Sequence, residues 1–364
     1  MSKKKKVLKK AKKQFKKAPK AVKFSFILLL IVIVGVTYLL YSQGYLNFLF
    51  DRNNQPGFTA GVHEQNEDGF YYYQETGLDE GQYYASIKNL TSDELVLELK
   101  NILNVYQPVS YGDARYVLEL SDRDPKDDFK SVRGIYDNDK IATEWIGKGD
   151  GAWQREHVWP NSKLGIPRVE NHHKNQGSDL HNLRAITGIN QTRSNRFFDS
   201  GSGDAKTIGT HAFYPGDEHK GDVARILFYM TIMYDVLSLT DDENLLKNNA
   251  ATNETPEGAY SGKMSLLIQW HKEDPVDEFE MRRNDIIYSG DVKDPSGKKI
   301  TPQGNRNPFI DKPELVHLIW EEKSIEDLTK PVDEIIEDVA FNGIYLILSN
   351  DLVYVNSRRK YVLW

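Results

Sequence analysis

The sequence has 364 residues, of which 39% are hydrophobic and 27% charged, and it contains no cysteine. This length permits one large domain or two modest ones, and the lack of cysteine excludes disulfides, thiolate metal sites and thiol nucleophiles. The net charge of -6 is unevenly distributed, because residues 1–23 contain 12 of the 47 basic residues and no acidic one. Residues 24–364 therefore hold 35 basic and 53 acidic residues, a net charge of -18. Opposite charges on the tail and the body indicate two different surroundings.

The lysine-rich tail 1–23 is followed by an uncharged apolar run of 18 residues, Phe24–Tyr41. A membrane-spanning helix needs about 20 such residues, so we expect a transmembrane anchor over 24–42. Lysines before the run and acidic residues only from Asp51 onward predict a cytoplasmic tail and an extracellular body. A cleaved signal peptide is the alternative, since Ser42–Gly44 has small-x-small character, but the run exceeds the roughly 7–15 residues of a signal core.

The body is predicted to consist of a polar linker over 43–69, an α+β catalytic domain over 70–325 and a small β appendix over 330–364. Periodic apolar residues predict helices over Ser92–Tyr106, Asp222–Leu237, Lys263–His271, Asp274–Ile286 and Pro313–Trp320. The sequence leaves Asp113–Leu120 ambiguous and predicts loops over Asp241–Gly258 and Asp291–Gln303. Alternating apolar residues predict three strands in the appendix, over Gly343–Ser349, Leu352–Asn356 and Lys360–Trp364.

The window 151–200 differs from the acidic body. It has seven basic and four acidic residues, a net charge of +3, and four of the nine histidines. A polyanion would be attracted to such a patch and repelled elsewhere. Chance clustering on a solvated face is the alternative interpretation.

Within this window, Trp153–Pro160 carries the neighbouring Glu156 and His157. Metal-assisted phosphodiester hydrolysis needs a general base, for which a neutral imidazole is suited, and a divalent ion that neutralises charge. Magnesium takes few protein ligands, and a carboxylate with an amide oxygen is such a set. Neighbours in a regular strand face opposite ways, so Glu156 and His157 can serve one site only at a strand end or bulge. Pro160 suggests such an end.

Each residue also has an ordinary structural explanation. A lone Glu-His pair is usually a surface feature, and Asn190 alone would be a turn residue. His172 and His173 suit a solvated loop better than a metal site with no third ligand at telling spacing. His181 is more simply a core histidine, and Trp153 and Trp159 are better explained as core or groove wall than as base-stacking platforms.

The joint occurrence and order of these motifs resemble the bacterial endonuclease I family of secreted and periplasmic nucleases, which have a ββα-metal (His-Me finger) active site. The resemblance covers roughly 70–320 and rests on Gly81–Ala85, Ser110–Gly112, Ile135–Tyr136, Arg155–Pro160, Asp179–Arg184, Asn190–Asn195, Gly221–Arg225, Asp274–Pro275 and Gln303–Phe309. It implies an α+β domain with a ββα-metal finger. The absence of cysteine, the anchor and the appendix depart from the usual secreted form.

The resemblance also implies roles for individual residues. His157 would be the general base, and Glu156 and Asn190 would be ligands of Mg²⁺, with other divalent ions often tolerated. Members of the family cut DNA with little sequence preference, some also cut RNA, and the products carry 5′-phosphates. The family's transition-state arginine has no clear match, and its role is left open. The further basic or polar candidates are Arg184 as a catalytic group and Arg155, Arg168, Lys174, Arg193 and Asn195 as substrate-binding groups.

The sequence therefore predicts a membrane-anchored extracellular endonuclease that depends on Mg²⁺ and acts on DNA, with RNA as a further substrate. Two alternatives remain. One is a non-catalytic module that binds nucleic acid or the cell surface on a nuclease scaffold. The other is a zinc hydrolase that uses His172, His173 and His181.

Overall fold

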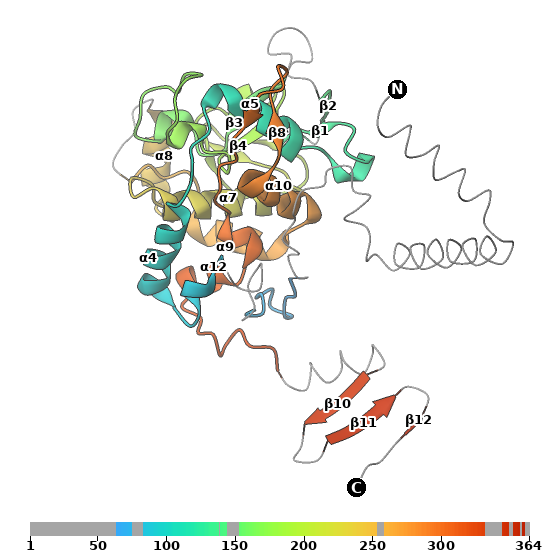
Figure 1. Cartoon of the computed structure of the whole chain (residues 1–364). Coiled ribbons are helices and arrows are strands. Elements are labelled where there is room, and N and C mark those ends of the chain that lie inside the picture. The colour runs from blue at the N-terminus through green and yellow to red at the C-terminus, as the bar shows by residue number, and fades with distance from the viewer. Residues whose placement is uncertain are drawn as a thin grey trace, which may run out of the picture. The chain divides into compact units, whose positions relative to one another are not determined.

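The computed structural model describes residues 63–74, 83–137, 139–143, 153–252 and 258–331, together with the backbone of short strands between 344 and 360 (Figure 1). The predicted tail 1–23 and anchor 24–42 lie outside the described residues, as does most of the linker 43–69. Among the residues that are described, no helix is long and apolar enough to cross a membrane.

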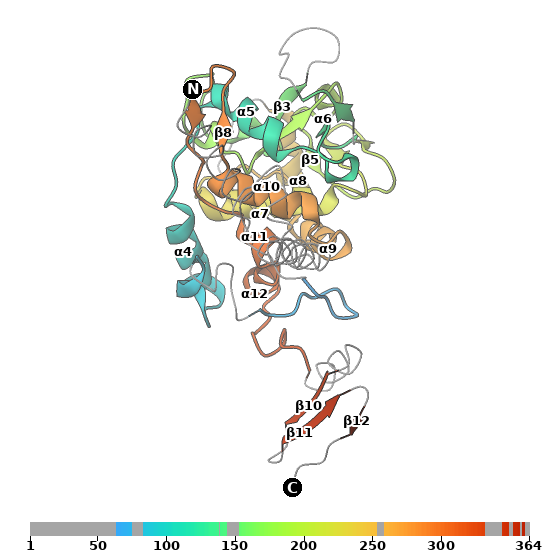
Figure 2. The same ribbon diagram turned by 45° about the vertical axis from the view of Figure 1, so that its right-hand side comes forward.

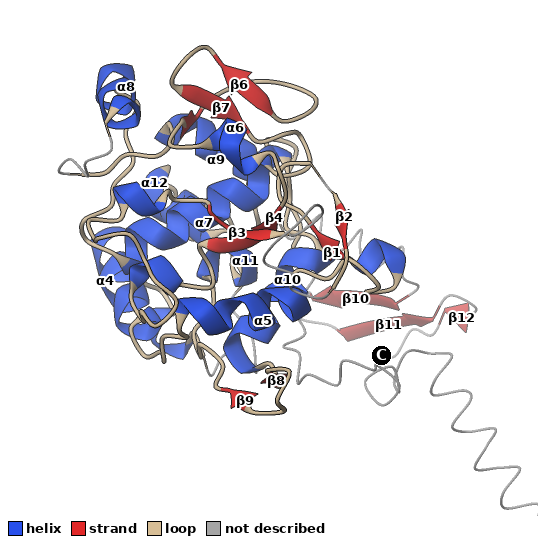
Figure 3. Ribbon diagram, turned by 90° about the horizontal axis from the view of Figure 1, so that it is seen from above, coloured by secondary structure: helices blue, strands red, loops and turns tan. Residues whose placement is uncertain are grey.

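The described domain is a mixed α+β structure in which helices dominate and the sheets are small, as the sequence predicted (Figure 3). The helices are α4 (Ser92–Leu103), α5 (Tyr111–Ser121), α6 (Asn190–Arg193), α7 (Lys220–Met233), α8 (Glu243–Ala251), α9 (Met264–Glu273), α10 (Glu278–Ser289), α11 (Pro308–Asp311) and α12 (Leu315–Trp320). The strands are β1 (Val132–Arg133), β2 (Lys140–Ile141), β3 (Gln154–His157), β4 (Leu183–Ile186), β5 (Phe197–Phe198), β6 (Lys206–Ile208), β7 (Ala212–Tyr214), β8 (Val292–Lys293) and β9 (Lys299–Ile300).

Helix α7 is the centre of the core. Nearly all of its residues are buried, and it packs against α4, α9 and α11 (Figure 2). A helix that is buried on all sides needs apolar residues around its whole circumference, and Phe228 accordingly stacks on Trp320 with ring centroids 4.5 Å apart. The sequence predicted this helix but placed its cap at Asp222. The helix begins at Lys220 instead, and Asp222 joins a buried ion-pair network.

Three local predictions were wrong. The expected loop 241–258 contains α8, which Asp242 caps by accepting hydrogen bonds from the backbone N–H groups of Asn244 and Leu245. Helix α10 begins at Glu278 and not near Pro275, because Asp277 and Glu280 form a capping box there. The expected loop 291–303 contains the hairpin β8–β9, whose turn has Gly297 at φ +85°.

The first and last described segments of the domain lie side by side. Tyr73 donates a backbone hydrogen bond of 2.7 Å to the carbonyl of Leu328, and Glu64 pairs with Lys330 at 2.8 Å. Figures 1 and 2 show this blue N-terminal segment at the end of the domain away from β3 and β4. The first and last described segments of the domain are therefore held together by a backbone hydrogen bond and an ion pair.

Further along the chain, the backbone forms β10 (Ile344–Leu348), β11 (Leu352–Asn356) and β12 (Arg359–Lys360), and neighbouring strands pair antiparallel. β10 and β11 overlap the first two predicted strands, whereas β12 shares only Lys360 with the third, whose other residues lie outside the described part of the chain. Whether they form a separate appendix stays a prediction.

Candidate active site

The two central sequence motifs form an antiparallel strand pair followed by a short helix. Glu156 of β3 lies opposite Arg184 of β4, and His157 lies opposite Leu183. Helix α6 follows β4 along the chain and begins at Asn190. This order of two strands and a short helix is compatible with the ββα-metal finger that the family resemblance implies, and it is called the ββα arrangement below.

Strand β3 ends at His157, and just beyond it the side chain of Asn182 forms the hydrogen bonds that a partner strand's backbone would otherwise form. Asn182 accepts a hydrogen bond of 2.6 Å from the backbone N–H of Trp159 and donates one of 3.0 Å to its carbonyl. The sequence predicted a strand end from Pro160 but gave no role to Asn182. Asn182 directly precedes β4, and this position in the sequence could have indicated that its side chain ends the pairing with β3.

His157 faces Tyr111, the first residue of α5. The two rings stack with centroids 5.4 Å apart and planes 25° apart, and Nε2 of His157 lies 2.8 Å from the carbonyl oxygen of Gly177. A neutral imidazole that donates from Nε2 carries its lone pair on Nδ1. Burial lowers the pKa of His157 to about 4, and the charges of Arg155 and Arg168 act in the same direction, whereas the Gly177 carbonyl opposes them. The ring is therefore neutral at pH 7 and can accept a proton at Nδ1.

Arg155 is already engaged in this stack. Its guanidinium lies 3.6 Å from the centroid of the Tyr111 ring and donates to the Tyr111 carbonyl. These contacts make Arg155 a support for the aromatic ring against which His157 packs, and its predicted contact with substrate stays a prediction.

Glu156 contacts different neighbours from those of His157. It is buried and accepts a hydrogen bond of 3.2 Å from the hydroxyl of Tyr136. Burial raises the pKa of Glu156 to about 7, while Arg193 and the Tyr136 hydrogen bond lower it. Because Arg193 belongs to α6, this helix packs near the Glu156 carboxylate, and Asn190 opens the same helix.

The side-chain types of Glu156 and Asn190, a carboxylate and an amide, suit a divalent cation. A buried carboxylate whose pKa is raised by burial is stabilised in its charged form by a nearby positive charge. A carboxylate and an amide are oxygen donors of the kind that Mg²⁺ prefers, with water filling the remaining positions. Glu156 could supply the carboxylate, and the sequence offers Asn190 for the amide.

The zinc alternative is not supported by the described part of the chain, where no three His, Asp or Glu side chains form a group that could hold a metal. His181 is buried with its Nε2 at 3.3 Å from the Asn305 carbonyl, which fits the core histidine that the sequence favoured. His172 is exposed beside Glu170. The indoles of Trp153 and Trp159 are fully buried core.

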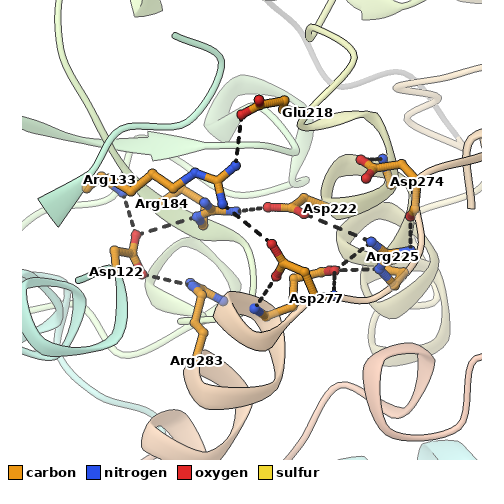
Figure 4. A network of polar contacts seen from close by, with 12 residues as sticks. Asp122, Arg133, Arg184, Glu218, Asp222, Arg225, Asp274, Asp277 and Arg283 are labelled. Carbon is orange, nitrogen blue, oxygen red and sulfur yellow. Dashed lines mark hydrogen bonds and ion pairs between the residues drawn. The ribbon is translucent and has the colours of Figure 1, made fainter. Parts of the chain in front are cut away.

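Two predicted phosphate-binding arginines are structural. Arg184 is 1% exposed and pairs with Asp222 at 2.8 Å and with Asp122 at 3.5 Å (Figure 4). Arg193 is fully buried over the ring of Phe198 and donates to the carbonyl of Val158 at 2.9 Å. Neither guanidinium is open to a substrate phosphate, so the expected catalytic role of Arg184 and the expected substrate contact of Arg193 are corrected.

The other candidates lie nearer the surface. Arg168 is exposed, no partner within the described residues pairs with it, and its charge lowers the pKa of both His157 and Tyr111. Lys174 is exposed and lines a pocket beside α5. Asn195 accepts a hydrogen bond of 2.9 Å from the hydroxyl of Ser162. Arg168 is thus the predicted basic group that combines exposure with proximity to His157.

Comparison with known proteins agrees with this geometry. The endonuclease I family matches residues 91–314, a range that includes β3, β4 and α6. An extracellular ribonuclease of Bacillus subtilis (strain 168) is 36% identical over 250 residues, which are 66% of this chain and 79% of the relative. An extracellular ribonuclease of Bacillus amyloliquefaciens is 34% identical over 248 residues, with the same two shares. The protein is thus a nuclease in class. More specifically, the chain belongs to the endonuclease I family.

The structural place of Arg184 predicts a loss of stability on substitution. Arg184→Ala leaves the buried carboxylates of Asp122 and Asp222 without this partner, which costs about 3–5 kcal/mol. Denaturant unfolding followed by circular dichroism would measure this loss, with Lys247→Ala, from an exposed pair with Glu243, as the control that changes little. An Arg184→Ala protein of unchanged stability that has lost all turnover would instead restore the catalytic role.

Proposed function

We propose that this chain is an extracellular endonuclease that hydrolyses phosphodiester bonds of RNA and DNA with a bound divalent ion, Mg²⁺ above all. The observation that carries the proposal is the state of His157. Its Nε2 is occupied by the Gly177 carbonyl, so that Nδ1 is available as a base beside the buried Glu156. The two relatives named extracellular ribonucleases support RNA as a substrate and an extracellular location. DNA follows from the family resemblance.

In the proposed mechanism, Nδ1 of His157 takes a proton from the attacking water. The Gly177 carbonyl and the Tyr111 ring keep the imidazole in place, and the low pKa keeps it neutral. Glu156 and Asn190 would hold the cation, which supplies charge neutralisation at the phosphate and at the leaving oxygen. The exposed Arg168 would bind the same phosphate, in the transition-state role for which the sequence offered no clear motif. Cleavage would leave a 5′-phosphate.

Attachment of the enzyme to a membrane stays a prediction. The apolar run 24–42 lies outside the described residues, and we propose, from the sequence alone, that it keeps the enzyme at the membrane with its catalytic domain outside. The non-catalytic alternative is disfavoured by the site, since a module that only binds has no need of a buried carboxylate beside an imidazole with a free nitrogen.

Replacing the proposed base tests the mechanism. His157→Ala should reduce turnover by about 10²–10⁴-fold, the usual contribution of general base catalysis, and leave nucleic-acid binding largely intact. Nicking of supercoiled plasmid and cleavage of structured RNA by the full-length chain, with Mg²⁺ and then with EDTA, would measure it. His172→Ala is the matched control, because His172 is an exposed histidine. Normal turnover by His157→Ala would remove His157 from the mechanism.

Replacing the proposed metal ligand separates metal binding from base catalysis. Glu156→Gln keeps the size of the side chain but removes the charge that a cation would need. We expect the Mg²⁺ concentration for half-maximal turnover to rise at least tenfold, and calorimetric titration with Mg²⁺ to give weaker binding. Unchanged values in both measurements would show that the metal is held elsewhere.

Arg168 is expected to act on the transition state without contributing to the fold. Arg168→Ala should lower kcat/KM by about 10–10³-fold, since a charge that stabilises a developing negative charge is worth several kcal/mol. Arg168→Lys should recover part of the loss. The midpoint of thermal unfolding should not change, in contrast to Arg184→Ala, and equal activity of Arg168→Ala and wild type would contradict the assignment.

A further inference from the structure

A pocket of about 340 Å³ lies beside the start of α5, and neither the family motifs nor the proposed mechanism uses most of its lining. Its walls come from three separate segments. Ser110 is the N-cap of α5 and Asp113 belongs to the first turn of that helix. Lys174 belongs to the loop before Gly177, and Lys298 and Lys299 belong to the hairpin β8–β9. Figure 3 shows this hairpin at the edge of the domain next to α5.

The segments that line the pocket are joined to the candidate active site by short covalent and hydrogen-bonded steps. Ser110 directly precedes Tyr111, whose ring stacks on His157. The backbone N–H of Tyr111 donates a hydrogen bond of 2.9 Å to the carbonyl of His173, the residue before Lys174. The same loop then reaches Gly177, which binds Nε2 of His157. The start of α5 and the loop that contains Lys174 and Gly177 therefore contribute both to the pocket and to the surroundings of His157.

The turn of the hairpin presents its lysines on a fixed backbone. The carboxylate of Asp294 accepts hydrogen bonds from the backbone N–H groups of Ser296 and Lys298 at 2.9 and 3.0 Å, and from the Ser296 hydroxyl at 2.6 Å. Gly297 supplies the positive φ that the turn requires. The Asp294 carboxylate holds the backbone of this turn in place, and its charge also attracts that of Lys298.

The charges around the pocket favour an anion. Lys174 and Lys298 are exposed, and no residue among those described forms an ion pair with either. Lys299 pairs with Asp291 at 3.1 Å, but both side chains are more than half exposed, and such surface pairs contribute little and are easily exchanged. Asp113 and Asp294 are the opposing charges, so the lining has three lysines against two carboxylates. Asp294 is hydrogen-bonded within the hairpin turn, and Asp113 is the carboxylate on the facing helix. It sits in the first turn of α5, where the helix dipole stabilises it.

We propose that this pocket is a binding subsite for the sugar-phosphate backbone of the nucleic-acid strand next to the scissile bond, with Lys174, Lys298 and Lys299 as its phosphate contacts. The inference rests on the proposed nuclease function and adds a second contact region to it. Outside the basic tail, the chain has a net charge of -18. A local group of lysines beside the base is therefore the feature that would guide a polyanion into the site. An enzyme with such a subsite prefers long substrates to short ones.

The test compares substrate lengths in the full-length chain. The variants are Lys298→Ala with Lys299→Ala, which together remove two positive charges. The control is Lys293→Ala, which removes one positive charge from the same hairpin at a residue that does not line the pocket. We expect the ratio of kcat/KM for a 20-nucleotide RNA to that for a dinucleotide to fall at least fivefold in the double variant and to stay near the wild-type value in the control. An unchanged ratio in the double variant, or an equal fall in the control, would overturn the proposal.

A binding measurement makes the result independent of catalysis. In the inactive His157→Ala background, fluorescence anisotropy of a labelled 20-nucleotide RNA would be followed against salt. Each lost phosphate contact to a single strand reduces the slope of log K against log salt by about 0.7, so the double variant should lose about 1.4. Asp113→Asn should act in the opposite sense and tighten binding at low salt. Equal slopes for the double variant and its parent would overturn the subsite, whereas a wild type that cuts neither RNA would overturn the proposed function.

Discussion

The structure depends on a buried network of arginines and carboxylates beneath the ββα arrangement. Arg184 of β4 pairs with Asp122 and Asp222, and Arg225 of α7 and Arg283 of α10 extend the network to Glu280 and back to Asp122 (Figure 4). Asp122 also accepts a hydrogen bond of 2.8 Å from the backbone N–H of Ala185 in β4. Removing charges from water is costly, but a network in which each guanidinium has a carboxylate offsets that cost and fixes one arrangement. In a chain without cysteine, these pairs take the place that disulfides could have in joining a strand to three helices.

This network determines where the catalytic groups lie. A two-stranded sheet of this size is at best marginally stable alone, so β3 has its position only because β4 is held by α5, α7 and α10. Asn182 then ends β3 directly after His157. The strand end gives two neighbouring residues different environments. His157 meets Tyr111 and a carbonyl and stays neutral, while Glu156 meets Tyr136 and α6 in a region where a cation would favour its charged form.

The features that the sequence predicted are those that depend on residues close together in the chain. The periodic helices, the strand end near Pro160 and the Glu156–His157 pair all rest on local spacing, and the motif order indicated the family. The sequence could not distinguish exposed arginines from buried ones. Arg168 and Arg184 both lie in the basic window 151–200, and only the packing shows that Arg168 is exposed and Arg184 is buried. The carboxylates that engage Arg184 lie far along the chain, and charge counting cannot place them. The hairpin β8–β9 was missed for a related reason, since its glycine- and lysine-rich turn is also typical of a loop.

The two ends of the domain and its site are separated by the core. The segment that begins at residue 63 is held against residues 328–330 by Tyr73 and Lys330, at the end away from β3 and β4. Because His157 belongs to β3, the candidate active site lies at the other end of the domain from these two segments (Figure 1). Residues 24–364 have a net charge of -18, so a polyanion such as nucleic acid needs local groups of basic residues to bind. The exposed Arg168, Lys174 and Lys298 are such residues, and Arg168 acts electrostatically on His157.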